Sequence, residues 1–243
     1  MKHAPSFPPL LNGHKATNGK DPARQARAMA NKGKLGAGDL VWSEDQKNLK
    51  FALVLEPEVD KQRCAEMLFA AMTAFGDAAG AICPPEIAIH YQWPNAILMN
   101  EARLGNCDLQ LSDNDTDGVP DWMIVSLSVA IAPKILKDDP GFMADETTMW
   151  DEGCGEITRT ELLEAVSRHL VNWIHNWQED GFKPIHDQWT GRLIEKQRIV
   201  PGLNDDVEFV SLDENGNALV NRGGQMELLG TLDALATLNG GDA

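Results

Sequence analysis

The sequence predicts an α+β fold: a mixed, largely antiparallel sheet with packed helices, followed by a small all-β unit. Apolar residues recur at helical spacing in the segments 60–75 and 156–180, whereas they alternate with the period of a strand between residues 86 and 131. Near the end of the chain, short apolar runs are separated by glycine-containing turns. These three patterns place helices on either side of the strand segments and end the chain with hairpins.

The first helix is expected over residues 23–32. Asp21 can accept hydrogen bonds from the free N–H groups of its first turn, and Pro22 suits the first helical position. Gly33 can adopt the left-handed conformation that ends a helix. Residues 1–20 contain three prolines and show no periodicity, so they are expected to form an extended lead-in.

The middle of the chain is expected to supply the main sheet. A strand is predicted over residues 49–55, and the segments 86–91, 107–111 and 122–131 follow the period of two that is typical of strands. Between them, a helix that begins at Asp60 carries one apolar stripe, which consists of Cys64, Met67, Leu68, Ala71, Met72 and Phe75.

The clearest helix is expected over residues 156–180. A capping box of Thr158 and Glu161 opens it, and Gly181 closes it. Its apolar stripe should lie on the sheet and consists of Leu162, Ala165, Val166, His169, Leu170, Trp173 and Trp177. Since a histidine and two tryptophans at this spacing are more often core residues than a cofactor site, we interpret them as packing.

The last part of the chain is expected to form a separate small meander, or a barrel, over residues 198–238. Asp213-Glu214-Asn215-Gly216 and Arg222-Gly223-Gly224 have the composition of hairpin turns. We therefore expect a main domain over 1–197 and a C-terminal domain over 198–243. About 40 residues bury too little surface to be stable alone, so this domain should pack on the first.

Composition restricts the classes of function. The 243 residues are 43% hydrophobic, and no apolar run approaches the roughly 20 residues of a membrane span. A formal charge of −16 repels phosphate backbones and anionic lipid, so neither nucleic acid nor a membrane is an expected partner. The N-terminus lacks a signal-peptide pattern, and the chain is expected to be cytoplasmic. Its four scattered cysteines favour reduced thiols over a disulfide or zinc framework: Cys64, Cys83, Cys107 and Cys154.

One short segment carries most of the functional information. An alternating strand, Ile87 to Gln92, runs directly into Trp93-Pro94-Asn95 and a further apolar run. This corner resembles the Lys-Trp-Pro-Asn-Asp signature of the biotin and lipoate protein ligases. Further segments of the family follow in the same order, so the resemblance covers nearly the whole chain; they are Arg103 to Gln110, Ile124 to Ala130, Thr147 to Gly153, the long helix and Trp189.

The resemblance implies a fold, a reaction and a pocket. The fold is the class II synthetase-like ligase fold with an SH3-like C-terminal domain. The reaction adenylates biotin or lipoate with ATP and transfers the acyl group to a lysine of an acceptor domain, so the family alone implies ATP and biotin or lipoate as cofactors. The implied binding residues are Gln92, Trp93, Asn95, Arg103, Gly105, Asn106, Ser126 and Ser128. No metal ligand is implied, and the catalytic residues stay unassigned.

Several departures from the family pattern indicate altered or lost catalysis. Gln92 replaces the lysine, Ala96 replaces the aspartate, and the segment 33–48 contains no arginine where the family has an Arg-Gly-rich adenylate loop. Serines stand at two glycine positions, Ser126 and Ser128. A charge at the reacting phosphorus is worth about 3 to 4 kcal/mol, so losing the lysine would cost about 10²- to 10³-fold in rate.

Two alternatives stay open. The chain could be a competent ligase whose cation is supplied by Lys47, Lys50 or Arg103. It could also be a non-catalytic scaffold that binds a cofactor or an acyl-carrier domain. The expected partners are accordingly a biotinyl or lipoyl acceptor domain or a small carboxylic acid. The sequence does not assign the ligand, the acceptor or the oligomeric state.

Three other motifs have plainer interpretations. Gly36-Ala37-Gly38 lacks the Walker lysine and is interpreted as a turn. The segment 113–118 imitates half of a calcium loop, but Ile124 stands where the bidentate glutamate is required, which favours an acidic hairpin. His186-Asp187 could join a serine in a triad, but no G-x-S-x-G nucleophile elbow supports it.

Overall fold

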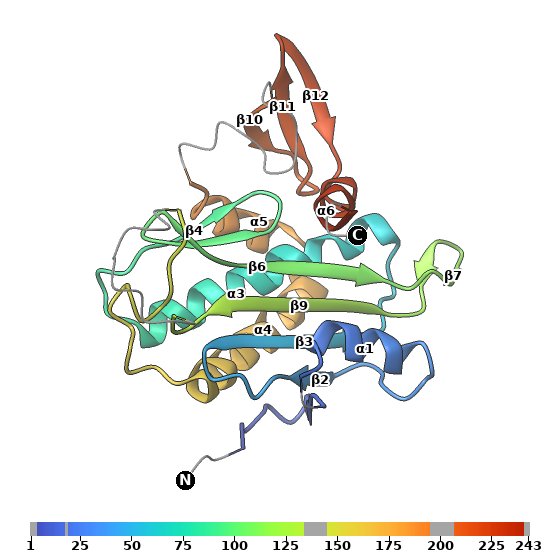
Figure 1. Ribbon diagram of the computed structural model, residues 1–243. Coiled ribbons are helices and arrows are strands. Elements are labelled where there is room, and N and C mark those ends of the chain that lie inside the picture. Colours follow the sequence, from blue (N-terminus) through green and yellow to red (C-terminus); the bar gives the residue numbers. More distant parts are fainter. Residues whose placement is uncertain (1–3, 18, 134–144, 195–206, 241–243) are drawn as a thin grey trace.

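The computed structural model describes residues 4–17, 19–133, 145–194 and 207–240 (Figure 1). Its centre is a seven-stranded sheet with the order β1-β2-β3-β9-β6-β5-β4. All neighbouring strands run antiparallel except β1 and β2. The strands are β1 (Asn12–Lys15), β2 (Asp39–Trp42), β3 (Asn48–Leu55), β4 (Ile89–Gln92), β5 (Ala96–Met99), β6 (Ala102–Leu111) and β9 (Met123–Ala130). The expected antiparallel sheet is thereby confirmed.

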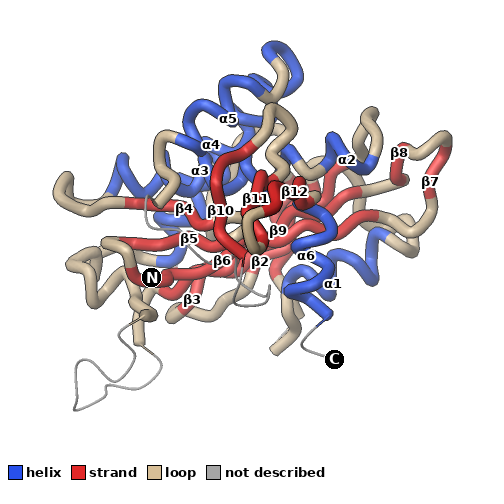
Figure 2. The backbone as a smooth tube through the Cα atoms, turned by 90° about the horizontal axis from the view of Figure 1, so that it is seen from above, coloured by secondary structure: helices blue, strands red, loops and turns tan. Residues whose placement is uncertain are grey.

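Helices cover both faces of this sheet. Viewed along the sheet, α3, α4 and α5 lie on one side, and α1 and α6 lie on the other (Figure 2). We call the side of α3 and α4 the core face and the side of α1 the outer face. The helices are α1 (Pro22–Ala30), α2 (Lys61–Cys64), α3 (Glu66–Ile82), α4 (Arg159–Asp180), α5 (Lys183–Thr190) and α6 (Thr231–Gly240).

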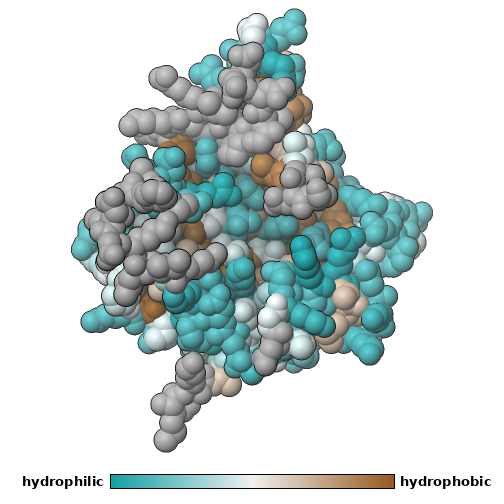
Figure 3. Space-filling view, viewed as in Figure 1, coloured by the Kyte–Doolittle hydropathy of each residue, from teal (hydrophilic) through white to brown (hydrophobic). Residues whose placement is uncertain are grey.

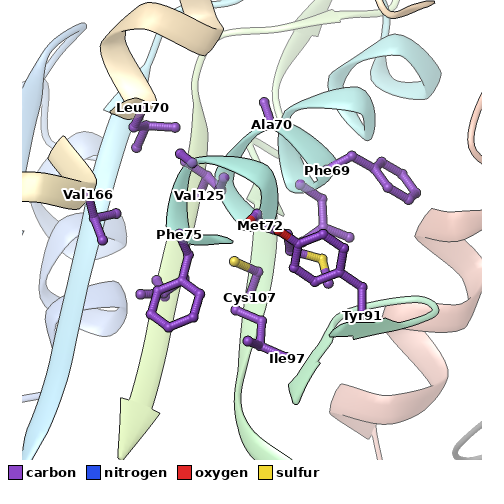
Figure 4. Packing of buried hydrophobic residues seen from close by; sticks show 14 of the residues in the cluster. Phe69, Ala70, Met72, Phe75, Tyr91, Ile97, Cys107, Val125, Val166 and Leu170 are labelled. Atoms are coloured by element: carbon purple, nitrogen blue, oxygen red, sulfur yellow. Dashed lines mark hydrogen bonds between the residues drawn. The ribbon is translucent and has the colours of Figure 1, made fainter. Parts of the chain in front are cut away.

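The register of the three central strands decides which residues reach each face. Leu127 of β9 lies opposite Phe51 of β3 and Cys107 of β6, and all three are buried on the core face. Residues one position along point the other way, because side chains alternate along a strand. Figure 4 shows this core, in which side chains of α3 pack against Cys107 and Val125 from the sheet and against α4.

Helix α3 is apolar around most of its circumference. The segment Lys61–Ile82 would be long and apolar enough to cross a membrane by length and composition, but 78% of its most apolar window is buried within the fold. Burial between the sheet and α4 therefore accounts for its hydropathy.

The C-terminal unit consists of an antiparallel three-stranded sheet and α6. Its strands are β10 (Val207–Leu212), β11 (Ala218–Arg222) and β12 (Gln225–Leu229). The unit contacts the main domain through Trp93, whose Nε1 donates to the backbone oxygen of Gly216 at 3.1 Å and whose ring lies beside Phe209. The expectation that this unit packs on the main domain is confirmed. The expected boundary at 197/198 lies outside the described residues, and an SH3-like barrel stays a prediction.

The helix ends follow the sequence closely. Asp21 caps α1 through hydrogen bonds from the N–H groups of Ala23 and Arg24, and Pro22 occupies the first turn. Thr158 and Glu161 form both bonds of the capping box of α4, and Gly181 follows it at a φ of 74°. These expectations are confirmed. Helix caps could be predicted because they depend on residues that are near one another in the sequence.

Four sequence expectations are wrong. The lead-in contains β1, and β2 falls in the segment 33–48, where no strand was expected. Both have only four residues, too few to establish a period. The expected meander ends early because residues 231–240 form α6, and α5 occupies the segment after α4, for which no element was predicted. The strand expected from residue 86 begins only at Ile89.

Gly105 allows β6 and β9 to approach closely. A Cβ atom at this position would lie 2.0 Å from the backbone oxygen of Ser128 and 2.8 Å from the Cα of Val129. We therefore expect Gly105→Ala to lower the free energy of unfolding by about 1 to 3 kcal/mol in urea denaturation, because neither backbone atom can move aside cheaply.

Gly80 provides the matched control. It lies in α3, and a Cβ atom there would meet nothing within 4 Å. Gly80→Ala should leave the free energy of unfolding unchanged or raise it by roughly 0.5 to 1 kcal/mol. Equal stability of the two variants would contradict the tight packing of β6 against β9.

Candidate functional site

A cavity of about 470 Å³ opens at the N-terminal end of α1. Its walls come from the loop between β1 and α1, from the turn between β2 and β3, and from Lys50 of β3. The surface on this side of the molecule is largely hydrophilic over α1 and its surroundings (Figure 3). We call this space the outer cavity; it is lined by Ala16, Thr17, Gly19, Lys20, Asp21, Pro22, Ser43, Glu44, Asp45 and Lys50.

A smaller cavity of about 40 Å³ adjoins the outer cavity. The two share Asp21, Pro22 and Lys50 in their walls, so Lys50 lies at their junction. We call this second space the inner recess. Its floor is the outer face of the central strands, and its remaining lining residues are Ala23, Phe51, Asn106, Ser126, Leu127 and Ser128.

The floor of the recess carries a row of polar side chains across three strands. Ser128 of β9 lies directly opposite Lys50 of β3 on one side and Asn106 of β6 on the other. Residues that face each other in this way have Cβ atoms about 4.5 to 5.5 Å apart. An ammonium, a hydroxyl and an amide therefore stand side by side on the outer face.

These polar side chains have no hydrogen-bond partner within the described part of the chain. No hydrogen bond joins the side chains of Lys50, Asn106, Ser126 and Ser128 to any described residue, although all four are half-buried. Half-buried groups of this kind require water or a ligand as a partner. The recess can therefore bind a small polar group. An anionic group is favoured, because Lys50 is the one cation among the described residues that line the recess, and the Asp21 carboxylate already accepts N–H groups of α1.

The carboxylates of the outer cavity are already engaged. Asp21 accepts two backbone N–H bonds of α1, and Glu44 forms an ion pair with Lys15 at 2.6 Å. Burial acts to raise the pKa of Asp45, but hydrogen bonds from Asn48 and Lys47 and the charge of Lys50 together hold that pKa below its usual value. Asp45 therefore stays ionised beside Lys50.

Helix α6 reaches the outer face next to the recess. The side chain of Asn239 donates to the Asp108 carboxylate at 3.0 Å, and Asp108 lies directly opposite Ser126. Burial raises the pKa of the Asp108 carboxyl above its usual value, and hydrogen bonds from Asn239 and Leu109 offset part of the rise. The site is thus bounded by α1 on one side and by a contact with α6 on the other.

The structure brings together three of the eight residues predicted from the sequence. Asn106, Ser126 and Ser128 line the inner recess. The other five line neither cavity; they are Gln92, Trp93, Asn95, Arg103 and Gly105.

The Trp-Pro-Asn corner has a structural role in the fold. Trp93 is fully buried, and its indole N–H also lies 3.3 Å from the hydroxyl of Thr231 in the C-terminal unit. Asn95 is buried as well, and its backbone oxygen accepts from the N–H of Cys107. Gln92 ends β4 and is half-buried, whereas Arg103 is exposed at the start of β6.

Sequence reasoning missed most of the outer cavity. Thr17 and Lys20 belong to the segment that was interpreted as a lead-in, and Asp21 was identified only as a helix cap. The shortened segment 33–48 does supply one wall, through Ser43, Glu44 and Asp45. Lys50 was named only as an alternative cation. The sequence could have indicated the role of Lys50, because a lysine on a strand of mostly apolar residues must extend its ammonium group into a polar space.

The other sequence motifs form no second site among the described residues. The acidic segment 113–118 forms part of a hairpin of β7 (Asp115–Thr116) and β8 (Val119–Pro120), and Asp115 pairs with Lys61. Trp177 is buried and donates to Glu66. Among the residues that the structure describes, no group of three histidine, cysteine or acidic side chains could hold a metal ion.

Comparisons with known proteins agree with the fold. A sequence model of the biotin/lipoate A/B protein ligase family matches residues 7–191. A biotin–[acetyl-CoA-carboxylase] ligase of Paracoccus denitrificans is 24% identical over 186 residues, which cover 75% of this chain and 77% of the relative.

Two solved structures extend this comparison. A biotin protein ligase-like protein of unknown function from Silicibacter sp. TM1040 has a TM-score of 0.84 and 33% identity, covering 95% of this chain and 99% of the other. The apo biotin protein ligase of Aquifex aeolicus has a TM-score of 0.70 at 16% identity, covering 90% and 96%. At 16% identity, the similarity to the Aquifex aeolicus protein concerns the fold alone.

The raised pKa of Asp108 predicts a pH dependence of stability. Because the folded protein holds this proton to a higher pH than the unfolded chain, the contribution is fully present below the unfolded pKa of about 3.9 and is lost as the pH rises through the folded value. Asp108→Asn removes this dependence and keeps an acceptor for Asn239. The variant should therefore gain stability relative to wild type as the pH rises above about 4 in urea denaturation.

Asp113→Asn is the control, since the side chain of Asp113 is 91% exposed. Its stability relative to wild type should change little over the same range. If Asp108→Asn loses stability relative to wild type as the pH rises, the assignment of a raised pKa is wrong.

Proposed function

The chain belongs to the biotin/lipoate A/B protein ligase family, and we propose that it is a divergent member that binds a small carboxylic acid but transfers biotin or lipoate weakly or not at all. The observation that carries this proposal is the charge of the outer cavity. Two lysines, Lys20 and Lys50, face three acidic side chains there, namely Asp21, Glu44 and Asp45.

Adenylation requires a cavity in which positive charges outnumber negative ones. A nucleotide triphosphate brings several negative charges, and the transition state at its α-phosphorus needs a fixed cation. The N-terminus of α1 could otherwise attract phosphate, but the carboxylate of Asp21 already accepts its free N–H groups. The described residues of this cavity therefore fit a single carboxylate better than a triphosphate.

The position of Gln92 supports the same proposal. It occupies the place of the family's lysine, carries no charge and lies at the end of β4, outside both cavities. Arg103, a second candidate cation, is exposed and contributes to neither cavity. Lys50 is then the cation best placed to bind an acid, because it stands at the junction of the two cavities.

The second candidate is a scaffold that binds an acceptor domain. The solvent-facing side of the C-terminal sheet exposes three apolar side chains, Val210, Met226 and Leu228, at 48%, 54% and 57%. Large exposed apolar side chains that lie together favour contact with a protein. The relative from Paracoccus denitrificans is named for acetyl-CoA carboxylase, so the biotin-accepting domain of such a carboxylase is the partner to test.

A transfer assay tests the proposal. We expect the wild-type chain, given ATP and biotin, to label an acceptor domain at least about 10²-fold more slowly than an active biotin protein ligase assayed alongside it, because its pocket lacks the family's cation. Gln92→Lys should raise any residual transfer. The readout is acceptor biotinylation together with pyrophosphate release.

Gln62→Lys is the matched control, since it adds the same charge at an exposed position of α2. It should leave transfer unchanged. Wild-type transfer at the rate of an active ligase would refute the proposal. If the chain binds the acceptor domain but no carboxylic acid stabilises the chain against unfolding, the scaffold function is favoured instead.

A further inference from the structure

We propose that the site takes a hydroxylated carboxylic acid, such as a sugar acid, rather than an acid with an aliphatic chain. The inference rests on the proposed function, because it assumes that the pocket still binds an acid. It adds the chemical class of that acid, which follows from the side chains that line the two cavities.

The inner recess suits the carboxylate end of such a ligand. Lys50, Ser128 and Asn106 can donate an ammonium, a hydroxyl and an amide hydrogen from adjacent strands. None of them has a hydrogen-bond partner among the described residues. The recess of about 40 Å³ holds only one or two water-sized groups, so it has room for a carboxylate but not for a ring.

The body of the ligand must then lie in the outer cavity, whose walls are hydrophilic. Among its lining residues that the structure describes, only Ala16 and Pro22 are apolar, apart from one glycine. An aliphatic chain gains affinity by leaving water for an apolar wall, but in this cavity it would cover polar surface as well as apolar surface. Such a ligand would also displace water from polar side chains such as the hydroxyl of Thr17 and the ammonium of Lys20, and would leave them unpaired.

A hydroxylated chain replaces those waters instead. The carboxylates of Glu44 and Asp45 have lone pairs beyond those that their protein partners use, so they can accept hydrogen bonds from ligand hydroxyls, and Lys20 can donate to them. The hydroxyl of Thr17, which also lines the outer cavity, can donate or accept. A site that is built to hydrogen-bond hydroxyl groups discriminates strongly against a ligand that lacks them.

Six-carbon acids provide a matched test, because D-gluconate and hexanoate have the same number of carbons and the same charge. Titration calorimetry of the full chain should show at least one of D-gluconate, D-glucuronate and D-galacturonate binding about tenfold or more tightly than hexanoate. Biotin and octanoate should bind no better than hexanoate. The proposal is overturned if hexanoate, octanoate or biotin binds as tightly as the best hydroxylated acid.

Variants locate the binding. Lys50→Met should weaken binding of the hydroxylated acid about tenfold or more, since Lys50 is the one cation among the described residues of the recess. Lys34→Met, at an exposed position outside both cavities, should not. If Lys50→Met does not fold, as judged by circular dichroism, Lys50→Gln replaces it. If the Lys50 and Lys34 variants bind the hydroxylated acid equally well, the assignment of the carboxylate to Lys50 is overturned.

Variants of the outer cavity test the preference itself. Thr17→Val with Lys20→Met removes a hydroxyl and an ammonium from the wall that faces the body of the ligand, so the ratio of hydroxylated-acid to hexanoate affinity should fall several-fold. If the ratio is unchanged, the outer cavity does not recognise the ligand hydroxyls and the proposal is overturned. Failure of this inference differs from failure of the proposed function. A missing preference for hydroxyl groups, with biotin transfer still about 10²-fold slower than by an active ligase, overturns the inference alone. Biotin transfer at a ligase's rate overturns the proposed function and, with it, the inference.

Discussion

The register of β9 between β3 and β6 is the constraint on which the rest of this structure depends. It places Leu127 beside Phe51 and Cys107 in the core and, one residue further, places Ser128 beside Lys50 and Asn106 on the outer face. A slip of one residue would exchange the two faces, burying a lysine under α3 and exposing the core. The hydrophobic core therefore also fixes the floor of the candidate site.

The outer face is divided between packing and binding. Helix α1 covers one part with Ala26 and Ala30, which pack near Ala52 and Ile124. Where α1 begins, the residues of the same strands become polar, and the two cavities open. On the far side, the bond from Asn239 to Asp108 brings the last helix of the chain to this face. Elements from both ends of the chain thus form the boundaries of one site.

The sequence allowed us to predict features that depend on residues close together in the chain. It did not allow us to predict contacts between residues that are far apart in the chain. Caps such as Thr158 and Glu161 were identified because both partners lie within one turn. Trp93 was expected in the pocket, but its indole N–H bonds Gly216, 123 residues away, and no local pattern indicates that contact. Asn106, Ser126 and Ser128 were predicted and do meet, because strand alternation fixed their common face. Lys50 and the loop before α1 join them only through tertiary packing.

The central claim is that an acid binds at the polar row of Lys50, Ser128 and Asn106 on the outer face, and that Gln92 and Arg103 do not contribute. A crystal structure of the protein with its tightest-binding acid tests this most directly. We expect the ligand carboxylate within hydrogen-bond distance of Lys50 Nζ and Ser128 Oγ, with its chain in the outer cavity beside Asp45. A carboxylate bound instead by Gln92 or Arg103, with the polar row contacting only water, would contradict the account.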